Sequence, residues 1–142
     1  MPPTFRFLTD DNLVLDSWPV FSPDGNTVLF QRQDVVDGPA TLYSVPACGG
    51  HARCFFQAKN PQTGACFNAQ HPDWSTVRSV FQIAFDDSGT IWLLDACTKT
   101  VQPLLYAEIG TSTYEWAHPA WFASGLYLLA TDESVAKNFK KS

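Results

Sequence analysis

A short segment of the chain contains several cysteine and histidine residues, which are types well suited to chemistry. Cys48, His51, Cys54 and Cys66 follow one another in the pattern C-x2-H-x2-C-x11-C, a spacing that is compatible with a zinc site. The same residues allow two other interpretations: a Cys48–Cys54 or Cys54–Cys66 disulfide, or reduced thiols that serve as small apolar side chains. A zinc-stabilised fold is therefore one hypothesis beside a purely structural role.

A second candidate site consists of residues that share one sequence context. His71 and His118 each precede a proline that is followed two residues later by an aromatic residue, and Trp18 stands in the same context. Imidazoles gathered at one point can bind a metal ion or an anionic ligand, whereas a half-exposed loop histidine can equally bond only the backbone. Trp116, with Tyr114 beside it, is the aromatic pair predicted to face a surface ligand.

Motifs for catalysis are missing from the sequence. It contains no Gly-x-Ser-x-Gly elbow, no His-Glu-x-x-His pair, no Gly-rich phosphate loop and no Asp-x-Asp-x-Asp-Gly calcium loop. Carboxylates such as Asp24, Asp86 and Asp87 fall where turns need a hydrogen-bond acceptor. The sequence thus favours a protein that is not an enzyme and has no cofactor.

An internal repeat of about fifty residues positions these side chains. Thr41–Cys48 aligns without gaps with Thr90–Cys97, so we expect Cys48 and Cys97 to superpose. The proline context of Trp18, His71 and His118 recurs at a similar interval.

Turn residues divide each repeat into short runs of β-forming residues. Ser22-Pro23-Asp24-Gly25 combines a preset φ, a side-chain acceptor and a glycine that accepts positive φ, which is a strong hairpin signal. An all-β fold is predicted, with strands over residues 18–22, 27–32, 41–46, 51–57, 71–75, 80–86, 90–95, 100–106, 117–122 and 126–131.

The segment from Trp18 to Phe30, followed by Thr41-Leu-Tyr-Ser-Val45 and Gly49-Gly50, resembles the TolB-type β-propeller repeat. The resemblance implies a single domain over residues 1–142, built from blades of four antiparallel strands. Its boundaries are blade 1 at about 18–57, blade 2 at about 71–106 and an incomplete blade 3 at about 116–139, which a strand at 4–8 completes. The recurring aromatics are then expected to pack between blades: Trp18, Phe21, Trp74, Trp92 and Trp121.

Three blades are too few for a ring, since propellers typically have about four to eight. We therefore expect a homodimer in which two half-propellers close a six-bladed ring and exchange the strand at 4–8.

The leading hypothesis for function is a non-enzymatic binding or scaffolding module whose ring face or channel binds a protein, a peptide or a small ligand. Candidate ligand-binding residues there are Trp18, His71, Trp116 and His118. The alternative is a propeller-derived hydrolase or lyase that uses His71 and His118, which requires them to converge with a carboxylate such as Asp73.

Composition limits the partners and the compartment. The net charge of −5, with nine Lys and Arg residues, argues against nucleic-acid binding. No run of about eighteen apolar residues is present, as a membrane span would require, and the N-terminus lacks the apolar stretch of a signal peptide. We expect no membrane span, and a cytoplasmic location as written, or a periplasmic or secreted one if a leader has been removed.

Overall fold

Ten β-strands make up the regular structure of the chain. The computed structural model describes residues 7–9, 13–34, 38–77, 81–105, 116–122 and 128–132. The strands are β1 (Leu15–Phe21), β2 (Thr27–Gln33), β3 (Thr41–Pro46), β4 (Arg53–Phe56), β5 (Gln70–Trp74), β6 (Gln82–Asp87), β7 (Thr90–Asp95), β8 (Val101–Leu105), β9 (Trp116–Trp121) and β10 (Leu128–Asp132). Within the described residues there is no helix, and hence none long and apolar enough to cross a membrane.

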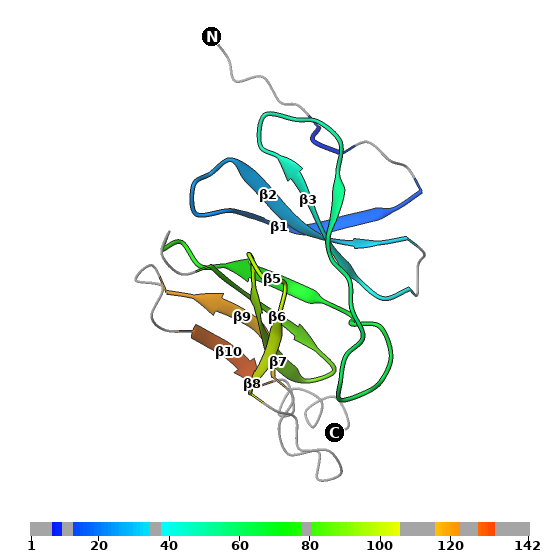
Figure 1. The fold of residues 1–142 in the computed structure, drawn as a ribbon, viewed down its shortest axis with the longest axis vertical. Coiled ribbons are helices and arrows are strands. Elements are labelled where there is room, and N and C mark those ends of the chain that lie inside the picture. The colour runs from blue at the N-terminus through cyan, green and yellow to red at the C-terminus, as the bar shows by residue number, and fades with distance from the viewer. Residues whose placement is uncertain are drawn as a thin grey trace, which may run out of the picture.

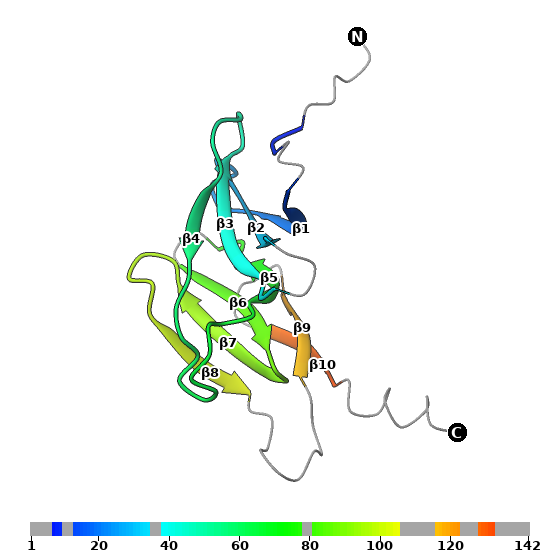
Figure 2. The same cartoon turned by 90° about the vertical axis from the view of Figure 1, so that its right-hand side faces the viewer.

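These strands form two four-stranded antiparallel sheets and one hairpin (Figure 1). The first sheet has the order β1-β2-β3-β4, the second has the order β5-β6-β7-β8, and β9 pairs with β10. The outer strands β4 and β8 lie on one side of the molecule and β1, β9 and β10 lie on the other (Figure 2).

The all-β prediction is confirmed, and the observed strand ends differ from the predicted ones by at most three residues. Most of the strand predicted at 4–8 and all of residues 133–139 lie outside the described residues. Leu8, which is described, packs against apolar side chains of the first sheet.

Turn chemistry explains where the hairpins form. Between β1 and β2, the Asp24 carboxylate accepts hydrogen bonds from the Ser22 hydroxyl at 2.6 Å and the Asn26 N–H at 2.9 Å, while Gly25 takes a φ of 74°. Between β6 and β7, Ser88 and Gly89 both have positive φ, at 52° and 82°. Two consecutive positive φ values are typical of the tight turn that matches the twist of a hairpin.

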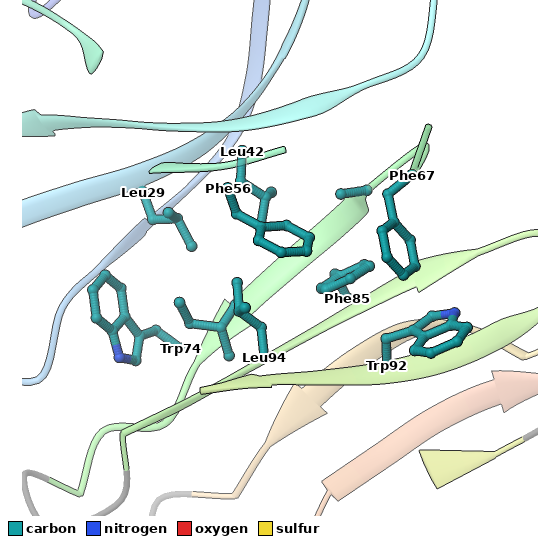
Figure 3. Close-up of a cluster of buried hydrophobic side chains, with 10 residues drawn as sticks. Leu29, Leu42, Phe56, Phe67, Trp74, Phe85, Trp92 and Leu94 are labelled. Carbon is teal, nitrogen blue, oxygen red and sulfur yellow. The ribbon is translucent and has the colours of Figure 1, made fainter. Parts of the chain in front are cut away.

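The two sheets pack face to face over a mainly aromatic core (Figure 3). Phe85 is fully buried, and its ring lies 5.9 Å from that of Phe56 and 5.4 Å from that of Phe67. Phe67 also meets Trp92 edge to face at 5.0 Å. The cluster draws on both sheets and on the connection between them: Leu29, Leu42, Phe56, Phe67, Ala69, Trp74, Ile83, Phe85, Trp92 and Leu94.

The connection between the sheets is tied down by buried polar groups as well as by Phe67. The side chain of Asn60, which is 1% exposed, donates to the Asp87 carboxylate at 2.7 Å. The Asn68 carboxamide accepts the N–H of Ala40 at 2.8 Å. These bonds satisfy groups that would be costly to bury unpaired, and they hold the second sheet against the first.

Truncation of Phe85 is expected to lower the free energy of unfolding by about 3–5 kcal/mol, because Phe85→Ala leaves a cavity between the two sheets. Urea unfolding followed by tryptophan fluorescence measures this change. Leu104→Ala is the control, since Leu104 is 43% exposed, and a change within about 0.5 kcal/mol is expected there. A loss below about 1 kcal/mol for Phe85→Ala would contradict the role of the aromatic core.

Candidate functional site

The strands β1, β5 and β9, which we call the inner strands, share one irregularity in their pairing. β1, β5 and β9 lie side by side, each at the start of its sheet or hairpin (Figure 1). The pairing of each with its neighbour shifts register around one residue. These residues are Trp18, His71 and His118, each of which precedes a proline. Because proline has no N–H, it cannot continue the ladder at that point.

All three residues have a left-handed backbone. The φ angles are 54° for Trp18, 50° for His71 and 51° for His118. Residues other than glycine rarely adopt such angles, which cost about 1–3 kcal/mol each and concentrate at functional sites. The same strain recurs in all three repeats and places three large side chains at one end of the inner strands.

Each strained histidine is held by the preceding sheet. The His71 N–H donates to the Gln31 side-chain oxygen at 2.8 Å, and the His118 N–H donates to Asp86 at 2.9 Å. Gln31 and Asp86 are equivalent, since each directly follows the phenylalanine that pairs with the aromatic residue of the third strand. An acceptor at this one position of β2 or β6 therefore secures the backbone of the next inner strand.

The side chains of the three residues meet. The His71 and His118 rings are nearly stacked, with centroids 3.8 Å apart and an interplanar angle of 32°. The Trp18 ring lies 4.5 Å from His71 and 5.5 Å from His118. Trp18 is 49% exposed, so a ligand can reach this group, which we call the inner-strand cluster.

Asp86 is the carboxylate that contacts both histidines of this cluster. One of its oxygens, Oδ2, lies 2.7 Å from His71 Nδ1 and also accepts the His118 N–H. A carboxylate can only accept hydrogen bonds when it is ionised, so in this contact Nδ1 is the donor and Nε2 points away from Asp86. The interpretation of Asp86 as a turn acceptor is wrong, because Asp86 lies within β6 and its side chain is 7% exposed.

Asp87 acts as a turn acceptor as predicted and also has a second role. It ends β6 and is buried, and its carboxylate binds Asn60 and the N–H of Asn68 in the connection between the sheets. In the turn after β6, Asp87 also accepts the Ser88 hydroxyl at 2.8 Å, and Asp24 acts as a turn acceptor as predicted.

Asp73 does not meet the histidines. It accepts the Trp121 N–H at 2.6 Å and so links β5 to β9.

The predicted ligand-binding residues are thus brought together in part. Trp18, His71 and His118 form the inner-strand cluster, whereas Trp116 lies at the start of β9, where its N–H donates to the Gly89 carbonyl at 2.9 Å. Tyr114 lies outside the described residues.

The recurring aromatics do not all pack in the core. Trp74 and Trp92 are buried as predicted, at 8% and 1% exposure. Trp18 and Phe21, at 49% and 61%, are not. The physical reason is that Trp18 turns toward the cluster, while Phe21 lies on the face of the first sheet that points away from the second.

The cysteines do not form a centre. Cys48, Cys54, Cys66 and Cys97 are all free and exposed, so the interpretation as reduced thiols is confirmed and the alternative of a Cys48–Cys54 or Cys54–Cys66 disulfide is wrong. Cys48 and Cys97 occupy equivalent turns after β3 and β7, which explains their exposure. In the part of the chain that the structure describes, no three His, Cys, Asp or Glu side chains gather closely enough to hold a metal ion, and this includes His51.

Comparison with known proteins identifies the architecture. No protein-family model matches the sequence, and no curated protein does. Among solved structures, TolB from Acinetobacter baumannii superposes with a TM-score of 0.62 at 16% sequence identity, over 87% of this chain. The fold is TolB-like.

The two four-stranded antiparallel sheets are consistent with propeller blades, and we call β1 to β4 blade 1 and β5 to β8 blade 2. The chain spans 28% of the length of that TolB chain. At this level of identity the similarity concerns the fold, and function must be argued from the site itself.

Removal of the charge of Asp73 is expected to stabilise the protein at neutral pH. Burial raises the pKa of Asp73 above its usual 3.8, although the N–H groups of Trp121 and Trp74 oppose the rise. A raised pKa means that the contribution of Asp73 to stability is present below pH 3.8 and is lost as the pH rises through the folded-state pKa. Asp73→Asn keeps an acceptor for Trp121 but carries no charge. Its free energy of unfolding should exceed that of the wild type at pH 7 and approach it below pH 4.

Asp95→Asn is the control of opposite sign. The N–H groups of Thr98 and Cys97 lower the pKa of the exposed Asp95, so its contribution is present above the usual pKa and is lost as the pH falls. Asp95→Asn should therefore lose a little stability at pH 7. Urea unfolding at a series of pH values measures both variants, and a neutral-pH loss for Asp73→Asn would contradict the assignment.

Proposed function

We propose that the chain is a non-enzymatic binding module whose ligand contacts Trp18, His71 and His118. The observation that carries this proposal is the convergence of three repeat-equivalent, left-handed residues whose rings touch at the inner strands. A binding site uses such strain to hold side chains in one geometry.

The chemistry of the cluster favours a ligand with both apolar and polar groups. Trp18 offers a half-exposed aromatic surface, and His71 offers an imidazole whose orientation the Asp86 carboxylate fixes. Tryptophan is enriched where proteins bind other proteins. A protein segment or peptide is therefore the favoured ligand, with a small molecule as the other option.

We also propose that the module is a half-propeller, with the β9–β10 hairpin as the beginning of a third blade. Two copies then complete a six-bladed ring, in which the inner strands of both surround one axis. Support comes from the order of the inner strands β1, β5 and β9, and from the apolar face that blade 1 turns away from blade 2.

A peptide library displayed on phage tests the binding proposal. Clones selected on the immobilised chain are expected to bind Trp18→Ala at least tenfold more weakly than the wild type, since the exposed indole is removed. Leu104→Ala, on the outer strand of blade 2, is the control and should bind as the wild type does. Clones that do not enrich, or that bind Trp18→Ala equally, would refute the site.

A second candidate function is a propeller-derived hydrolase or lyase. The observation that favours it is the 2.7 Å contact between Asp86 and His71 Nδ1, because a carboxylate on one imidazole nitrogen orients the other as a general base. Mass spectrometry of the selected peptides separates the two functions. Cleavage by the wild type but not by His71→Gln favours the enzyme, and intact peptides favour the binding module.

A further inference from the structure

The two faces of a blade can be told apart by strand register. In blade 2, the face that meets blade 1 is built from residues that pair across β5, β6 and β7. We call it the leading face, and its residues are Trp74, Ile83, Phe85, Trp92 and Leu94. Each of them is at most 8% exposed, and all belong to the core between the blades.

The same register positions define the leading face of blade 1. In blade 1, Phe21 pairs with Val28, Val28 with Val45, and Phe30 with Tyr43. The equivalent pairs in blade 2 are Trp74 with Ile83, Ile83 with Leu94, and Phe85 with Trp92. Blade 1 therefore repeats, residue for residue, the surface with which blade 2 receives another blade.

This face of blade 1 is covered at Val28, Phe30 and Val45, which are at most 6% exposed, but not at Phe21. Phe21 is 61% exposed, whereas its counterpart Trp74 is 8% exposed. A shallow groove follows the face and is lined by Leu8, Pro19, Val28, Phe30 and Val45, among others. Leu8 covers one part of it, and no other blade meets it within the described residues.

We infer that the leading face of blade 1 docks a second copy of this chain, through the β9–β10 hairpin of that copy. The inference rests on the proposed closure of two half-propellers. Blade 1 packs on blade 2, and β9 in turn packs on β5 and β6, so the hairpin is the next unit in the ring. Its far side is thus the surface that a leading face receives. One chain carries both surfaces, which makes two copies complementary to each other.

The strand register links this docking surface to the ligand site. Gln31 of blade 1 secures the N–H of His71, and Asp86 of blade 2 secures the N–H of His118. Gln31 pairs with Ser17 of β1, and Asp86 pairs with Gln70 of β5. In the hairpin, Thr131 pairs with Ala117 of β9 at the same place in the register. Thr131 therefore stands at the register position that Gln31 and Asp86 hold in the two blades.

Trp18 is the member of the inner-strand cluster for which the acceptor of the backbone N–H would come from a preceding blade. On docking, Thr131 of the second copy reaches the register position that serves the N–H of Trp18. The second copy thereby completes the backbone support of the ligand site, so the site is shared between two chains.

Sedimentation of the full chain at micromolar concentration tests the docking surface. The wild type is expected at twice the 15.8 kDa chain mass. Phe21→Arg places a charge in the interface and is expected at the chain mass, with the dimer weakened at least 100-fold. Leu104→Arg is the matched control, because Leu104 is also an exposed apolar strand residue, and it should remain a dimer.

Hydrogen exchange at single residues gives a second readout that does not depend on Phe21→Arg. The amide of Trp18 is expected to exchange slowly in the dimer and at least tenfold faster after dilution to monomer. The amides of His71 and His118 should be slow in both states, since their acceptors lie in the same chain.

The outcomes separate the docking surface from the function on which it rests. A wild-type monomer, or a mass that keeps rising with concentration, would overturn both ring closure and docking. A dimer that persists in Phe21→Arg, or a Trp18 amide insensitive to dilution, would overturn the docking surface alone. Binding of the selected peptides is measured separately, and its loss in Trp18→Ala supports the ligand site whichever result the masses give.

Discussion

The packing of aromatic side chains between the two blades is the interaction on which the rest of the structure depends. The apolar face of a four-stranded sheet must be buried against another element of the structure. Phe56 from one blade, Phe85 and Trp92 from the other, and Phe67 from the connection remove that surface from water together. The same contact sets the angle between the blades, and so it decides which ends of β1 and β5 lie close together.

The inner-strand cluster follows from this packing. Because the inner strands are neighbours, an irregularity repeated in each brings three rings within contact distance. The strained backbone of each histidine persists because a side chain of the preceding blade accepts its N–H. The left-handed backbones, the side chains that accept their N–H groups and the contacts among the three rings therefore depend on one another. Loss of the packing between the blades would remove all three.

Asp86 shows how one residue serves both structure and chemistry. It holds the backbone of His118 and orients the ring of His71, so the two histidines respond to one carboxylate. This coupling suits a binding site that needs a fixed geometry. It is equally the arrangement of a histidine base with its carboxylate partner, which is why the chemistry of a bound ligand, and not the geometry alone, separates a binder from an enzyme.

The sequence by itself determined the strands, the turns and the repeat, since these depend on local chemistry. Proline, aspartate and glycine between residues 22 and 25 define a hairpin in any context, and the context of Trp18, His71 and His118 recurs along the chain. The tertiary structure alone decided that Asp86 belongs to the site, that Asp73 does not, and that the cysteines and Phe21 are exposed. The physical reason is that burial and partnership depend on which blade lies opposite, and the local sequence around a residue does not contain that information.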